Sequence, residues 1–237
     1  FSVGPKAVGF ALIFRVFILA AQTAAFPWTI LAVAIAGLTM TIGNFTALQQ
    51  TNIKRLLAYS TIAQAGYILI GLSVATPLGI QASLFYILVY AVMNLAAFGA
   101  VVLISNTTKS ENIESYVGLY KREPLAAVIL AIAFLSLAGI PPFVGFFGKF
   151  LLLAAAVEKG FFTLAIIAVI NSVAALYYYV KVIQFMFLRE PSGTPVSSAQ
   201  SPALTFVLVV LTVFIVVLGV YPHPVLQYLA EILFLIQ

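Results

Sequence analysis

Seven apolar runs, most of them about 20 residues or longer, dominate the chain and leave few ways for it to fold. A helix of about 20 residues matches the roughly 30 Å hydrocarbon core of a bilayer. Hydrophobic residues make up 64% and charged residues 7% of the chain, against about 25% charged in soluble domains. The sequence therefore predicts an all-α, polytopic transmembrane helix bundle. The predicted spans are 2–22, 27–49, 53–74, 78–104, 125–157, 161–188 and 203–220.

The segments outside these spans predict the rest of the architecture. Residues 105–123 and 189–202 form the longer polar loops, and the second is expected to be flexible because it contains Pro-Ser-Gly-Thr-Pro. Residues 225–236 are apolar but too short to span a bilayer, so they predict a short interfacial helix. The chain starts with Phe1 and an apolar span. We expect 1–237 to be a single transmembrane domain, the C-terminal part of a longer protein.

Loop charges predict the orientation, because cytoplasmic loops accumulate lysine and arginine. With alternating spans, most basic residues fall on one side, which is assigned to the cytoplasm, and the carboxyl terminus falls on the other. Lys159 and, more weakly, Arg15 lie toward that other side. The cytoplasmic group contains Lys54, Arg55, Lys109, Lys121, Arg122, Lys181 and Arg189.

Composition also argues against several kinds of site. The basic residues are scattered rather than clustered, so no nucleic-acid partner is predicted. The chain has no cysteine for disulfides or thiolate ligation, and its single His223 lies in a Tyr-Pro-His-Pro turn without companion ligands. We predict no cofactor and no metal site on this chain.

Lys149 is the strongest candidate for chemistry, because it is the one charge between Pro124 and Val157. A charge at bilayer depth costs about 2.5 to 3.5 kcal/mol on insertion scales, so it marks an ion or proton path. The pair Pro141-Pro142 predicts a broken helix beside it, and Gly145 and Gly148 are expected to leave room for water. The alternative is a structural lysine that plugs the break.

Two further lysines are candidates. Lys6 lies among small residues in the first span and would carry protons, or else snorkel from a helix end. Lys54, followed by Arg55, starts the third span and is either a proton carrier or, more simply, a topological anchor. All six acids lie in loops, at span ends or in the tail. Because burial disfavours the charged form of lysine, a buried lysine must be neutral part of the time, hydrated, or paired outside this chain.

Uncharged polar residues inside the spans have two interpretations. They could extend a hydrated path, or they could form hydrogen bonds between packed helices, typically worth about 0.6 kcal/mol. The second interpretation is favoured for each residue taken singly. The residues are Thr39, Thr41, Asn44, Thr46, Tyr59, Ser60, Thr61, Gln64, Asn94 and Asn171.

Three motifs in order resemble the antiporter-like subunits of respiratory complex I, and the N subunit most closely. They are Ser-Val-Gly-Pro-Lys-Ala-Val-Gly-Phe-Ala at 2–11, Gln-Thr-Asn-Ile-Lys-Arg-Leu-Leu-Ala-Tyr-Ser-Thr-Ile-Ala-Gln-Ala-Gly-Tyr at 50–67, and Leu-Ala-Gly-Ile-Pro-Pro-Phe-Val-Gly-Phe-Phe-Gly-Lys-Phe at 137–150. The resemblance implies helices eight to fourteen of a fourteen-helix fold. It makes Lys6 the central lysine of helix eight and Lys149 the lysine of helix twelve. The family's glutamate and lysine of helices five and seven are absent from this sequence.

On this resemblance the chain is a proton-translocating, non-redox membrane subunit of NADH:quinone oxidoreductase. FMN, iron–sulfur clusters and quinone would belong to other subunits, and its partners would be neighbouring antiporter-like subunits and the lipid bilayer. The bacterial cytoplasmic membrane is the expected location, with the thylakoid or mitochondrial inner membrane as alternatives. A multisubunit cation/proton antiporter or a membrane-bound hydrogenase remains an alternative, as does a structural membrane scaffold.

Overall fold

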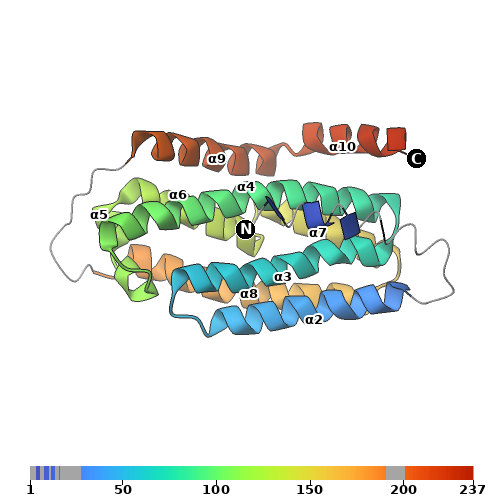
Figure 1. The fold of residues 1–237 in the computed structure, drawn as a ribbon, viewed down its shortest axis with the longest axis horizontal. Helices are drawn as coiled ribbons and strands as arrows, with labels where there is room; N and C mark the ends of the chain where they lie inside the picture. The colour runs from blue at the N-terminus through green and yellow to red at the C-terminus, as the bar shows by residue number, and fades with distance from the viewer. Residues whose placement is uncertain are drawn as a thin grey trace.

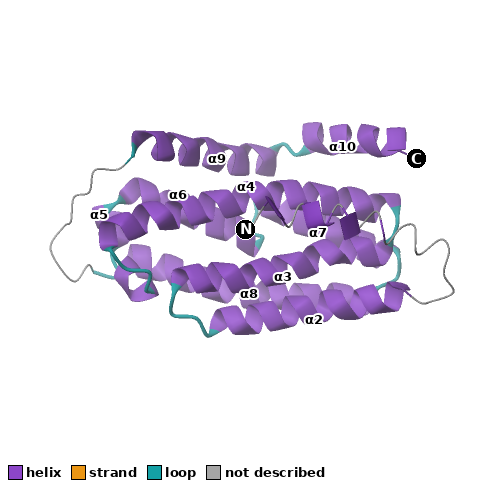
Figure 2. Ribbon diagram, viewed as in Figure 1, coloured by secondary structure: helices purple, strands orange, loops and turns teal. Residues whose placement is uncertain are grey.

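The computed structural model describes residues 4–5, 8–10, 12–13, 16, 28–190 and 201–236, with side chains as far as residue 231. Helices joined by short loops make up most of these residues (Figure 2). The longer elements are α2 (Trp28–Leu48), α3 (Ile53–Val74), α4 (Pro77–Thr108), α6 (Pro124–Ala138), α7 (Val144–Glu158), α8 (Phe162–Leu188), α9 (Pro202–Val220) and α10 (His223–Ile236), with the short η1 (Ile113–Tyr116) and α5 (Leu119–Arg122) between α4 and α6.

The helices run side by side along the long axis of the molecule (Figure 1). α3 lies inside the bundle, with 72% of its apolar span buried, whereas α9 lies at an edge, with 22% buried. α2 packs against α3 and α8, and α9 packs against α4. Contact between helices is close where residues are small, as where Gly66 meets the Ala36 backbone and the Met40 side chain.

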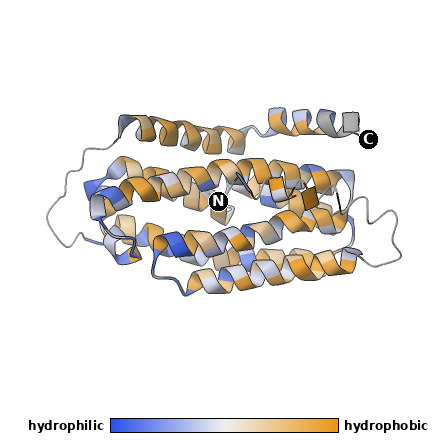
Figure 3. Ribbon diagram, viewed as in Figure 1, coloured by the Kyte–Doolittle hydropathy of each residue, from blue (hydrophilic) through white to orange (hydrophobic). Residues whose placement is uncertain are grey.

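Five of the described helices, α2, α3, α4, α8 and α9, are long and apolar enough to cross a membrane. Apolar residues predominate along the bundle, and hydrophilic ones gather around α5 and the start of α3 (Figure 3). The chain is therefore an integral membrane protein, and the predicted all-helical class is confirmed.

Helix ends follow from local sequence. Asn52 caps α3, because its side-chain oxygen accepts hydrogen bonds from the backbone N–H groups of Lys54 and Arg55. Thr76 caps α4 in the same way, with Pro77 at the first turn. α6 ends at Gly139, whose φ of 89° lies in the left-handed region that glycine adopts without steric cost.

Most predicted spans coincide with helices, and the differences are informative. The predicted span 125–157 is two helices, α6 and α7, interrupted where Pro141-Pro142 was expected to break it. The predicted loop at 105–123 is wrong at its start, since α4 continues to Thr108. There the Thr108 hydroxyl donates to the Ile104 carbonyl, and Lys109, in a left-handed conformation, ends the helix.

Some predictions fall outside the described residues or stay untested. Most of the first span, and most of the predicted loop at 189–202, lie outside the described residues. The tail forms α10, which continues in the direction of α9 (Figure 1), and the Gln81 side-chain amide donates to the Leu226 carbonyl. The interfacial position of 225–236 stays a prediction, as does the assignment of the two membrane sides.

Candidate functional site at the broken helix

The break between α6 and α7 frees backbone carbonyl groups inside the bundle. The last carbonyls of any helix lack intrahelical partners. Here the N–H of Gly139 donates to the carbonyls of Leu135 and Ser136, and that of Ile140 donates to Leu135. The carbonyls of Leu137 and Ala138 accept from side chains instead. These two oxygens are a polar site at the negative end of the α6 helix dipole.

The Lys149 side chain occupies this site. It is only 4% exposed, and its Nζ atom donates to the carbonyl oxygens of Leu137 and Ala138 at 3.0 Å each. The ion pairs found among the described residues, Lys54–Glu111 and Lys121–Glu190, involve other lysines. Two backbone carbonyls therefore accept the hydrogen bonds of the Lys149 amine, where carboxylates accept those of Lys54 and Lys121.

An aromatic ring completes the surroundings of the Lys149 amine. Nζ lies 4.6 Å from the ring centroid of Tyr67, within the range of a cation–π interaction. The Tyr67 hydroxyl is within 2.9 Å of both the Ala168 carbonyl and the Ser172 hydroxyl, which hold the ring in place from α8. Tyr67 is buried, and so it faces the amine rather than solvent.

Gln64 shares one of the two carbonyls. Its Nε2 atom donates to the Leu137 oxygen at 3.2 Å, and its Oε1 atom accepts a hydrogen bond from the Tyr86 hydroxyl. The Tyr86 bond orients the amide, so that the donor end of Gln64 faces the break. Lys149 and Gln64 are thus linked through the Leu137 carbonyl oxygen, and Tyr86 joins them through the Gln64 side chain.

The two glycines beside Lys149 serve close packing. A Cβ on Gly145 would collide with the Ser136 carbonyl, and one on Gly148 would collide with the Tyr86 ring. The Gly145 N–H also donates to the Ser136 hydroxyl at 3.1 Å. Protein atoms therefore occupy the space that the sequence suggested for water at these positions. Pro141 and Pro142 lie in the turn between the helices, joined by a cis peptide bond.

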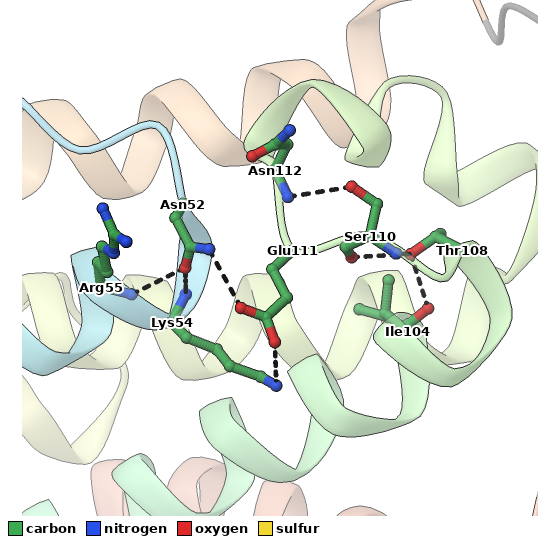
Figure 4. A network of polar contacts seen from close by, with 8 residues as sticks. All are labelled: Asn52, Lys54, Arg55, Ile104, Thr108, Ser110, Glu111 and Asn112. Atoms are coloured by element: carbon green, nitrogen blue, oxygen red, sulfur yellow. Dashed lines mark hydrogen bonds and ion pairs between the residues drawn. The ribbon is translucent and has the colours of Figure 1, made fainter.

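Lys54 lies at an end of the bundle, in the ion pair with Glu111 (Figure 4). Asn52 Nδ2 also donates to Glu111 at 3.1 Å, and backbone bonds join Ile53 to Glu111 and Ile113 to Thr51. Hydrogen bonds from Lys54, and then from Asn52, lower the pKa of the Glu111 carboxyl. This cluster ties the start of α3 to the polar segment after α4. A proton-carrying role for Lys54 stays a prediction.

Polar residues of α2 and α8 bond to each other. Asn44 donates to Asn171 at 3.0 Å, Asn171 donates to the Thr41 hydroxyl at 3.1 Å, and Tyr178 donates to Asn44 at 3.0 Å. For Thr41, Asn44 and Asn171 the structure thus shows the interhelical hydrogen bonds that the sequence favoured.

The structure surrounds Lys149 with residues that the sequence did not single out as a group. Nothing in the sequence marked Tyr67 or Tyr86 individually as a neighbour of Lys149. Lys6 lies outside the described residues, so its relation to Lys149 stays a prediction.

Comparison with known proteins relates the chain to one family of membrane proteins. The family described as "NADH:quinone oxidoreductase/Mrp antiporter, TM" matches residues 1–175. The chain belongs to this family. It is 45% identical to NADH-quinone oxidoreductase subunit N 2 of Chloroherpeton thalassium, over 97% of this chain and 47% of that relative. The resemblance to the N subunit is thereby confirmed.

Solved structures of membrane complexes contain chains with the same fold. One chain of the archaeal membrane-bound sulfane sulfur reductase superposes with a TM-score of 0.88 at 31% identity, covering 95% of this chain and 46% of that one. A chain of respiratory complex I from Thermus thermophilus with bound aureothin gives a TM-score of 0.72 at 34% identity, covering 83% and 44%. This chain spans about half the length of the curated relatives it matches.

Proposed function

We propose that the chain is part of a proton-translocating membrane subunit of an NADH:quinone oxidoreductase, and that Lys149 carries the proton. The observation that supports this most is a buried amine held by two backbone carbonyls and an aromatic ring. Burial opposes the charged form, while the carbonyls and the ring favour it. Because these effects oppose each other, a modest change in nearby charge can load or release the proton.

The driving force would come from outside this chain. Redox chemistry on other subunits, which would hold FMN, iron–sulfur clusters and quinone, would change the electric field along the membrane arm. The responding element on this chain would be Lys149, and Lys6 would relay protons to it. Neighbouring antiporter-like subunits would be the partners, and the bacterial cytoplasmic membrane the location.

Replacing Lys149 tests the proposal. Lys149→Met keeps most of the side-chain volume and removes the ionisable amine, and the matched control Lys159→Met removes an exposed lysine at the end of α7. In inverted membrane vesicles, the initial rate of NADH-driven proton uptake should fall by roughly tenfold or more in Lys149→Met. The control should pump normally. Undiminished pumping by an assembled Lys149→Met complex would refute the proposal.

A cation/proton antiporter is the second candidate, because the family description includes Mrp antiporters. The two functions differ in what drives the proton. Sodium-driven pH changes in vesicles that lack NADH and quinone would support the antiporter. Proton uptake that requires NADH and is abolished by a quinone-site inhibitor would support the oxidoreductase.

A further inference from the structure

An open groove follows α8 from the buried amine toward one end of the bundle. A cavity of about 220 Å³ reaches Lys149 between α7 and α8 and is lined by Phe150, Val173 and Leu176 among others. A second cavity, of about 520 Å³, continues along α8 to Lys181 and Arg189. Val173 and Leu176 line both cavities, so the two adjoin.

The wall of this groove is an apolar stripe on one face of α8. Val169, Val173, Leu176 and Val180 are spaced by four, three and four residues, which places them on one side of a helix. Val169 is 49% exposed and Val173 is 63% exposed. A hollow of this kind, along a helix long and apolar enough to span a membrane, suits the acyl chain of a lipid.

The groove has a cationic end. Lys181 and Arg189 are exposed, and the ion pairs found among the described residues belong to Lys54 and Lys121. The Arg189 guanidinium packs over the Phe185 ring at 3.9 Å, which holds it at the mouth of the groove. Among the described residues, neither Lys181 nor Arg189 forms an ion pair, although Glu114 lines the adjoining hollow with Lys181.

The distance from Val173 to Lys181 is close to the depth of one leaflet of a bilayer. Lys181 lies eight residues from Val173, or about 12 Å along α8, and half of the hydrocarbon core of a bilayer is about 15 Å thick. The backbone of Arg189 lies about 24 Å from Val173, but its guanidinium turns back over the Phe185 ring, toward Lys181. With Lys181 at the headgroup level, Val173 and the opening toward Lys149 would lie near the middle of the membrane.

We propose that this groove is a binding site for a phospholipid with an anionic headgroup. The phosphate binds Lys181 and Arg189, and arginine suits it because the guanidinium donates two parallel hydrogen bonds. An acyl chain lies over Val173 and Leu176 and ends beside Lys149. The lipid thereby closes the membrane-facing side of the amine with hydrocarbon, so that water reaches Lys149 only from inside the protein.

Photo-crosslinking tests this site in the complete complex. The complex is reconstituted into bilayers with a trace of phosphatidylglycerol that carries a diazirine in its acyl chain, or with matched phosphatidylcholine. Adducts are mapped by mass spectrometry. Phosphatidylglycerol should label α8 around Val173 more strongly, by about fivefold for each cation at subsaturating lipid. Lys181→Gln with Arg189→Gln should reduce this labelling to the phosphatidylcholine level, whereas Lys159→Gln should leave it unchanged.

A groove-filling variant separates headgroup recognition from the groove itself. Val173→Trp adds bulk without changing charge, so it should reduce labelling by both lipids. Equal labelling by the two lipids in the unmodified complex would overturn the proposed anion site. Absence of lipid adducts on α8 in the unmodified complex, with adducts on other membrane-facing helices of the same sample, would show that lipid does not occupy this face and would also overturn it.

Discussion

The Tyr67 ring gives the sharpest test of how the Lys149 amine is stabilised. The cation–π contact at 4.6 Å is desolvated, and such contacts are worth about 2 kcal/mol. Removing the ring in Tyr67→Leu should therefore weaken proton binding at Lys149 by roughly 30-fold, since each tenfold change corresponds to about 1.4 kcal/mol. Tyr67→Phe keeps the ring and loses only the hydrogen bonds to Ala168 and Ser172, so proton binding should change little.

The assay is the pH dependence of proton uptake per NADH oxidised, measured in vesicles that contain comparable amounts of assembled complex. The profile of Tyr67→Leu should move to lower pH by about 1.5, while that of Tyr67→Phe should stay near the wild-type profile. Assembly on native gels controls for the cavity that leucine leaves. If Tyr67→Leu pumps with an unchanged pH profile, the ring does not stabilise the cation. An equal displacement in Tyr67→Phe would assign the effect to the hydroxyl.

Further predictions concern parts of the bundle away from the amine. Because Lys54 lowers the pKa of Glu111, the Glu111 contact stabilises the fold above the ordinary glutamate pKa of about 4.3 and is lost as pH falls through the lowered value. Hydrogen exchange at the adjoining backbone amides, corrected for intrinsic rates, should show constant protection from neutral pH to about 4 and opening below it. Protection in Glu111→Gln that equals the wild-type protection throughout that range would contradict this. Gly145→Ala should destabilise the complex by about 1 to 3 kcal/mol in thermal unfolding because the added methyl meets backbone, whereas Gly37→Ala has room and should not. Asn171→Leu should cost about 0.6 to 1.7 kcal/mol of stability and leave pumping intact; loss of pumping at normal assembly would instead place Asn171 on the proton path.

The lengths of the apolar runs predicted most of the helices, because a bilayer-spanning helix needs about 20 consecutive apolar residues and few other structures tolerate such a run. Span 53–74 coincides with α3, and Pro141-Pro142 correctly marked the break between α6 and α7. The end of α4 was missed, because serine and threonine at 105–108 suggest a loop by composition. The hydroxyls of Thr107 and Thr108 bond back to the preceding turn, which allows the helix to continue.

The candidate site was predicted in part. A lone lysine in an uncharged span beside a proline pair located the amine, since the cost of burying a charge makes it conspicuous. The partners of Lys149 could not be predicted, because Tyr67, Leu137 and Ala138 meet it only through packing of α3 and α6 on α7. The sequence also suggested open space at Gly148, where the Tyr86 ring fits. Small residues admit either water or a neighbouring side chain, and tertiary packing decides which.

The protonation state of the Lys149 amine during turnover can be observed directly by solid-state NMR. Nitrogen-15 labelling of lysine in the complete complex, with the Lys149 resonance assigned by its absence in Lys149→Met, distinguishes ammonium from neutral amine. Proton transfer through Lys149 requires both forms during turnover, so the ratio of ammonium to neutral amine should change when NADH is supplied. A resonance that remains fully ammonium from pH 6 to 10, while the same sample pumps protons, would contradict proton transfer through Lys149.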